Sequence, residues 1–441
     1  MAYLKNDDLP FPAAGQGSSI FSLTVLFGCY FAIMYLVGIF GLIGMAMGSI
    51  IGLLLIRKEI LKSETKSFHE FLLERLNPNE RSGLMLGLFV AFSQTAYSIS
   101  ELIIIRQTLH LGIGVDSSYA TFATIGLAFV GYIYCLQGGY LAVYKTDIVQ
   151  FVAVLIMGLL FLFAPFNQII AGKKSILFGT APQLWAFNLP IKGILLQTIN
   201  LIFGCFSGIG FILGTPDTWK RVFITTKLGH RNSFLYLILA GLMPFVILLP
   251  VFFVAGYASS IDSPVTFLIE IYSIKNSAVL AIILLGFIAS FLSSFDSAIV
   301  VAVHLLSLKK LGKESTLRDE VTNYYNYLAL VFLVANVLFG ILLLVVNNPY
   351  FLANLLLCNF AIISSILMGT GGYRRKISLS LITALMVIGF VSWFVYLVEV
   401  MPETIKTTST TQIKTIPAGI LLGIIITTIS FIFSKKSNAT S

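Results

Sequence analysis

Charged residues and cysteines are both scarce in this sequence. Only 11% of its 441 residues are charged, whereas 57% are hydrophobic and the mean hydropathy is +0.94. That balance excludes an ordinary soluble globular domain. The cysteines lie in apolar runs without the spacing of a metal site, so we expect buried thiols and no disulfide framework. They are Cys29, Cys135, Cys205 and Cys358.

Signatures of enzymes are missing as well. The sequence has no phosphate-binding loop, no histidine and cysteine cluster suited to a metal, and no credible nucleophile motif. We therefore expect no enzymatic activity. The net charge of +9 does not indicate nucleic-acid binding, because the charges sit in short loops between apolar runs. The expected partners are the lipid bilayer and a small solute, with no nucleic acid and no obligate protein partner.

Apolar runs of nearly twenty residues recur along the chain, and each is long enough to cross a hydrocarbon core of about 30 Å. The sequence thus predicts an all-α polytopic membrane protein. Twelve spans are expected, at residues 12–36, 38–57, 83–105, 117–136, 146–166, 190–213, 233–257, 276–304, 323–347, 349–370, 376–399 and 415–434. The first two form one apolar run, which is expected to turn back at Gly38–Gly44.

Lysines and arginines are distributed unevenly between the two sides. With the N-terminus in the cytoplasm, 21 of the 28 fall on the cytoplasmic side and seven outside. This excess predicts that both termini are cytoplasmic, in the inner or plasma membrane. The polar start of the chain is unlike a cleavable signal peptide, and the chain ends shortly after the last span, so no attached soluble domain is expected.

Spans 1 and 6 are rich in glycine and stand five spans apart, so their topologies are opposite. The glycines are Gly15, Gly17 and Gly28 in span 1, and Gly204, Gly208, Gly210 and Gly214 in span 6. Interrupted helices in corresponding positions of two halves are typical of inverted-repeat transporters. The alternative is that glycine is simply common in membrane helices.

A stripe of hydroxyls marks span 8. At about 100° per residue, Ser290, Ser293, Ser294 and Ser297 share one helix face. Such a face either packs closely against a neighbouring helix or supplies oxygens to a small cation. Asp296 lies off that face, and a carboxylate inside a span is usually functional.

Asp147 lies near the inner end of span 5, at a depth compatible with the serines. A carboxylate beside hydroxyls is a reasonable site for Na⁺ or a proton. Alternatively, Thr146 or Asp147 caps the helix and pairs with Lys145.

Further polar residues follow in spans 3 and 8. Gln94, Ser98 and Glu101 share one face of span 3, where they either form a polar wall or let Glu101 reach the headgroups. His304, on the serine face of span 8, is either interfacial or a proton relay.

Four segments together resemble the sodium:solute symporter family. They are GSSIFSLTVLFG (17–28), GGYLAVYKTDIVQ (138–150), GTPDTWKRVFITTK (214–227) and SSFDSAIVVAVHLLSLK (293–309). Their order and spacing agree with the family, over about residues 9–370. The resemblance implies a core at 1–370 with repeats at 12–166 and 190–370. Two further helices and a short cytoplasmic tail then occupy 371–441.

The resemblance also implies a Na⁺ site between spans 1 and 8. By position, its ligands are the carbonyls of Ser22, Val25 and Ser290 and the hydroxyls of Ser293 and Ser294. Asp147 matches an aspartate that contributes to a second Na⁺ site in some members. Three features depart from the family: its extra N-terminal helix is missing, Lys220 replaces a glutamine before Arg221, and no aspartate closes the span 8 motif near Lys309.

The expected function is Na⁺-coupled import of a small organic solute by alternating access. Expected solute contacts are the polar or soft groups on spans 1, 3 and 6, namely Thr24, Cys29, Gln94, Ser98 and Ser207. One alternative is proton coupling through Asp147, Glu101 or Asp296. Another is a solute sensor without net transport.

Overall fold

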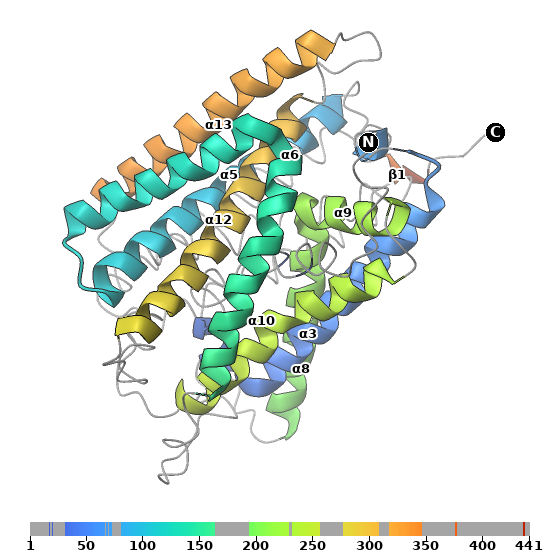
Figure 1. The fold of residues 1–441 in the computed structure, drawn as a ribbon. Helices are drawn as coiled ribbons and strands as arrows, with labels where there is room; N and C mark the ends of the chain where they lie inside the picture. Colours follow the sequence, from blue (N-terminus) through green and yellow to red (C-terminus); the bar gives the residue numbers. More distant parts are fainter. Residues whose placement is uncertain are drawn as a thin grey trace.

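The computed structural model describes most of spans 2 to 9, and these are helical (Figure 1). The described residues are Gly17, Ile20, 31–66, Phe68, 70–72, 81–163, 194–228, 232–255, 277–307, 317–345, 375–376 and 435–436. The helices are α3 (Phe31–Lys62), α5 (Arg81–Gln107), α6 (Ser117–Phe163), α8 (Ile194–Gly214), α9 (Pro216–Phe223), α10 (Ser233–Ala255), α12 (Ser277–Ser307) and α13 (Leu317–Val345). Two π-helical turns, η3 (Thr108–Gly112) and η5 (Ile224–Leu228), follow α5 and α9. The predicted spans 10, 11 and 12, and most of span 1, lie outside the described residues.

The described helices have the character of membrane spans. Three stretches of the described residues are long and apolar enough to cross a bilayer, namely Phe40–Lys62, Ser117–Leu136 and Leu280–Leu306. Large apolar side chains such as Phe122 and Leu333 are exposed on the outside of the molecule, where a soluble protein carries charge. The chain is a multi-pass membrane protein.

The helices form two groups, which Figure 1 separates clearly. In one group α3 packs along α8 and against α10. In the other, α12 lies between α5, α6 and α13. Phe287, Phe291 and Phe295 recur every four residues on α12 and are almost completely buried. Because α12 is enclosed on several sides, its sequence is apolar all round except for the serine face and Asp296.

Contacts in the second group follow the expected inverted repeat. A five-span offset relates α5 to α12, and the first half of α6 to α13. Helix α12 packs on α6, its counterpart α5 packs on α13 in the same way, and α5 and α12 also contact each other. These contacts are the ones that the expected inverted repeat requires.

The contact between α3 and α8 corrects two predictions. Helix α3 runs unbroken through Gly38–Gly44, so the predicted turn there is wrong, and α8 is helical through Gly204, Gly208 and Gly210. A Cβ on Gly48 would meet the carbonyl oxygen of Cys205, and a Cβ on Gly208 would meet that of Met45. These glycines let two backbones approach closely rather than interrupting a helix. The chain leaves the helix only after Gly214.

Helix α6 also differs from the prediction of two spans joined by a loop. It is helical from Ser117 to Phe163, without a loop between spans 4 and 5. Figure 1 shows that α6 bends sharply, so its two halves run in different directions. Sharp kinks occur at glycine pairs, and Gly138 and Gly139 lie between the predicted spans.

Several segments assigned to one side of the membrane do meet in space. The Lys227 ammonium donates to the carbonyl of Ser63 at 2.7 Å. Strand β1 (Arg375–Lys376) pairs antiparallel with β2 (Lys435–Lys436). All of these residues belong to the segments predicted to be cytoplasmic. The contacts agree with their lying on a common side, without showing which side that is.

Candidate functional site

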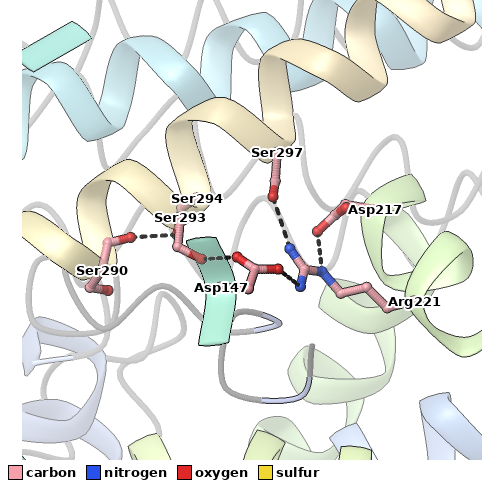
Figure 2. A network of polar contacts seen from close by, with 7 residues as sticks. All are labelled: Asp147, Asp217, Arg221, Ser290, Ser293, Ser294 and Ser297. Carbon is pink, nitrogen blue, oxygen red and sulfur yellow. Dashed lines mark hydrogen bonds and ion pairs between the residues drawn. The ribbon is translucent and has the colours of Figure 1, made fainter. Parts of the chain in front are cut away.

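Arg221 is the centre of a buried polar network (Figure 2). Its side chain is 0% exposed. Nε donates to Asp217 Oδ2 at 2.6 Å, Nη1 to Asp147 Oδ2 at 2.7 Å, and Nη2 to Ser297 Oγ at 2.8 Å. The guanidinium thus joins α9, α6 and α12, using its planar fork to bind two carboxylates at once.

The position of Arg221 follows from the local structure of α9. Thr215 is extended, with φ −100° and ψ 101°, and Pro216 then begins a new helix with its fixed φ. Asp217 and Arg221 are four residues apart, so they lie on one face of α9 and bond to each other. Trp219 is almost fully buried, and its Nε1 donates to the carbonyl of Leu213 at 2.8 Å. These contacts fix the helix against the end of α8.

Asp147 receives hydrogen bonds on both carboxylate oxygens. The hydroxyl of Ser293 donates to Oδ1 at 2.8 Å, while Arg221 occupies Oδ2. With its amide turned to satisfy both atoms, the Gln150 nitrogen donates to Asp147 Oδ1 at 3.2 Å and to Ser293 Oγ at 3.0 Å. Asp147 lies in the interior of α6 and pairs with Arg221. The helix-cap alternative for this residue is therefore wrong.

The serine face of α12 is turned toward this network. Ser290, Ser293, Ser294 and Ser297 are all buried. The hydroxyl of Ser294 donates to the carbonyl of Ser290 at 3.1 Å. Ser293 and Ser297 instead bond the charged side chains of α6 and α9. The structure thus brings Asp147 together with the α12 serines, as their predicted depth required.

The network carries more negative than positive charge. Asp147 and Asp217 supply two carboxylates, and Arg221 supplies one guanidinium between them. Asp217 Oδ1 has no hydrogen-bond partner among the described residues. Hydroxyl, carbonyl and carboxylate oxygens are the ligands that hard cations prefer. The arrangement therefore has the chemistry to accept one additional small cation.

Lys220, which replaces a glutamine of the family pattern, adjoins the network outside the spans. Burial lowers the pKa of Lys220 to about 7, against the opposing influence of Asp217, while Arg221 lowers it further. When Lys220 is deprotonated, the two carboxylates and one guanidinium keep their net negative charge.

Asp296 lies apart from the serine face, as its register predicted. Its side chain is 0% exposed, and neither carboxylate oxygen has a side-chain partner among the described residues. The Cys135 thiol donates to the Asp296 backbone carbonyl at 3.9 Å. Cys135 is a buried thiol, as predicted, whereas Cys205 is only half-buried.

The span 3 residues are all buried. Gln94 is 5% exposed, and Ser98 and Glu101 are 0% exposed, with the Ser98 hydroxyl donating to the Gln94 carbonyl at 3.2 Å. The alternative in which Glu101 reaches the headgroups is wrong, because its side chain is completely buried inside the molecule. His304 packs its ring near Phe68, with centroids 6.3 Å apart.

Other predicted ligands cannot be placed in this network. Ser22, Thr24, Val25 and Cys29 lie outside the described residues. Ser207 lies within α8, but its side chain is not among those described. The span 1 half of the predicted Na⁺ site, and all of the predicted solute contacts, therefore stay predictions.

Arg221 and Asp217 were missed as site residues by the sequence reasoning. Arg221 was counted among the loop charges that orient the spans, yet it is completely buried. The available signal was the Asp-x-x-x-Arg spacing directly after Thr215–Pro216, which pairs opposite charges on one helical turn. Their burial depends on α6 and α12, which are distant in sequence.

Comparison with solved structures identifies the fold. A Na⁺-coupled sialic acid symporter, solved in a substrate-bound outward-open state with a novel Na⁺ site, has a TM-score of 0.55 and 14% identity over 97% of this chain and 91% of that chain. The manganese transporter of Eremococcus coleocola has a TM-score of 0.54 and 11% identity, over 95% of this chain and 94% of that chain. No family model and no curated protein matches the sequence.

This chain has a secondary-transporter fold. At these identities the likeness concerns the fold alone, and membership of the sodium:solute symporter family stays a resemblance.

Proposed function

We propose that this protein is a Na⁺-coupled symporter that imports a small organic solute across the cytoplasmic membrane by alternating access. The observation that carries the proposal is the buried set of Asp147 with the Ser293 and Ser294 hydroxyls and the Ser290 carbonyl. The likeness of the fold to a Na⁺-coupled sialic acid symporter supports the same class. No catalytic step is part of the proposal.

In this proposal the residues of α12 replace the water around the ion. Ser293 and Ser294 turn their hydroxyl oxygens to Na⁺. The Ser290 carbonyl then binds the cation in place of its hydrogen bond from Ser294. Carbonyls of span 1 at Ser22 and Val25 complete the first site, as the family resemblance implies. Asp147 then receives Na⁺ on its way to the cytoplasm. Each charge moved through 100 mV contributes about 2.3 kcal/mol to uptake.

The solute is sought first by binding. A thermal-shift screen of small organic solutes, each with and without Na⁺, identifies compounds whose stabilisation depends on the ion. Uptake of such a compound into proteoliposomes is then measured with an imposed Na⁺ gradient. Accumulation that follows the Na⁺ gradient supports the proposal. Binding without accumulation contradicts it and favours a sensor.

Proton coupling is the second candidate. It is favoured by Asp296, a fully buried carboxyl without a side-chain partner among the described residues. An isolated carboxylate is costly in such surroundings, so proton binding is the simplest way to neutralise it. Imposing a pH gradient without Na⁺ on the same proteoliposomes separates the two. Accumulation driven by that gradient alone identifies a proton symporter.

A further inference from the structure

Arg221 connects the two groups of helices. Its backbone belongs to α9, which continues from α8 through Thr215 and packs against α3. Its guanidinium reaches Asp147 on α6 and Ser297 on α12, in the other group. Figure 2 shows the Arg221 side chain extended from α9, with its guanidinium beside Asp147 and Ser297. Movement of α9 away from α12 therefore requires that these bonds break.

A cation that binds Asp147 competes with Arg221 for the same carboxylate. Two positive charges about 4 Å apart repel each other strongly where water is excluded. Arg221 has an alternative partner in Asp217, which it already contacts at 2.6 Å. Asp217 Oδ1 has no hydrogen-bond partner among the described residues, so it can accept a second N–H of the guanidinium. The guanidinium can thus leave Asp147 and still be paired.

We propose that Na⁺ and Arg221 exchange on Asp147, and that this exchange releases α9. The Arg221–Asp147 ion pair holds α9 against α6 and α12. Na⁺ arriving at Asp147 displaces the guanidinium onto Asp217, and α9 then separates from the second helix group. This inference rests on the proposed function, and it assigns to Arg221 the link between ion binding and helix movement.

Trp219 provides a local reporter of this movement. It is two residues from Arg221, buried at 1% exposure, and its ring centroid lies 5.9 Å from that of Phe71. The other tryptophans, Trp185 and Trp393, lie far from it in the sequence and are replaced by phenylalanine for the experiment. Emission from the remaining tryptophan then reports on α9 alone.

The experiment titrates the full-length protein in nanodiscs with NaCl, using choline chloride to keep the ionic strength constant. Thermal stability gives the half-saturating Na⁺ concentration, and Trp219 emission gives the position of α9. In the protein with native Arg221, saturating Na⁺ is expected to shift the emission. Arg221→Gln is expected to lower the half-saturating concentration about tenfold, which corresponds to about 1.4 kcal/mol. Its emission without Na⁺ should match that of the parent protein with saturating Na⁺.

Asp217→Asn should change the half-saturating Na⁺ concentration in the opposite direction to Arg221→Gln. Without Asp217, the guanidinium has Asp147 as its remaining carboxylate partner in this network, so Na⁺ should displace it at a higher concentration. Arg221→Lys keeps the charge but cannot bond both carboxylates and Ser297 together, so a smaller decrease in the half-saturating Na⁺ concentration is expected. This variant takes the place of Arg221→Gln if that protein fails to fold. Arg106→Gln is the matched control, because Arg106 bonds the hydroxyls of Ser117 and Thr121. It should change neither readout.

The outcomes separate the exchange from the proposed function. A half-saturating Na⁺ concentration that is unchanged or increased in Arg221→Gln overturns the exchange, while Na⁺-driven uptake by the native protein still supports symport. Opposite shifts in Arg221→Gln and Asp217→Asn support the exchange, since misfolding would not produce both. A native protein that neither binds Na⁺ nor uses its gradient overturns both proposals.

Discussion

The contact between α3 and α8 and the contact of α9 with α6 and α12 are both buried, yet they differ in chemistry. In the first, glycines bring two backbones together and leave no room for a Cβ at Gly48 or Gly208. In the second, one guanidinium bonds two carboxylates and a hydroxyl. Closely packed backbones fit together in one arrangement, whereas the charged groups of an ion pair can exchange partners. The first contact suits a rigid unit, and the second suits a site that changes during transport.

The largest effect is expected from filling the α3–α8 contact. Gly48→Leu places a side chain against the backbone of Cys205, so the helices must separate and stability should fall by about 3 kcal/mol or more. Fluorescence-detected size exclusion and thermal unfolding measure the loss. The control is Gly126→Leu, because a Cβ at Gly126 meets nothing within 4 Å. Equal stability of the two variants would show that the contact is not close-packed.

Removing the charge of Asp147 tests the second contact. Asp147→Asn should weaken Na⁺-dependent stabilisation, because the ion loses a carboxylate ligand, and should lower stability by about 1–3 kcal/mol through the loss of a charged partner. Thermal unfolding in NaCl and in choline chloride measures both effects. A variant that still responds to Na⁺ like the native protein would remove Asp147 from the ion site.

Ser297→Ala should have a smaller effect. It removes one hydrogen bond to Arg221, worth about 1.5 kcal/mol, while both carboxylates keep their contacts with the guanidinium. Stability should decrease slightly, and the Na⁺ response should persist. Loss of the response would instead assign the Ser297 hydroxyl to the ion, which the present account does not do.

The last prediction concerns the direction of a pH dependence. Lys220 has a pKa of about 7 in the folded protein and 10.5 as its ordinary value, so the unfolded chain binds a proton over this range that the folded chain does not. Folding stability should therefore decrease as pH falls from about 10.5 to 7, with no further contribution from Lys220 below that range. Lys220→Gln should remove this dependence in thermal unfolding between pH 7 and 9. The same dependence of stability on pH in the native and variant proteins would contradict the lowered pKa of Lys220.

The sequence was sufficient to predict that spans 2 to 9 are helical, though not that spans 4 and 5 form one continuous helix, and to predict the buried serine face of α12 and its proximity to Asp147. These follow from apolar run length, helical periodicity and membrane depth, all of which are local. The role of glycine in α8 was misjudged, because the same residue either interrupts a helix or allows close packing. Only the position of α3 distinguishes these cases.

Arg221 shows the other limit of sequence reasoning. A basic residue shortly after a span is usually exposed at the membrane surface, where it orients the chain. Its burial requires carboxylate and hydroxyl partners from α6 and α12, more than seventy residues away along the sequence. No local sequence pattern predicts contacts between residues so far apart in the chain. The pairing with Asp217 was visible, but spacing alone did not distinguish an exposed pair from a buried one.

The central claim is that the Ser293 and Ser294 hydroxyls hold Na⁺ beside Asp147. Its most direct test is the thermal stability of purified native protein and of the Ser293→Ala and Ser294→Ala double variant, titrated with NaCl against choline chloride. The account predicts saturable stabilisation of the native protein by Na⁺, about 2.7 kcal/mol at one hundred times the dissociation constant, and none of the folded double variant. Equal stabilisation of both proteins would contradict it.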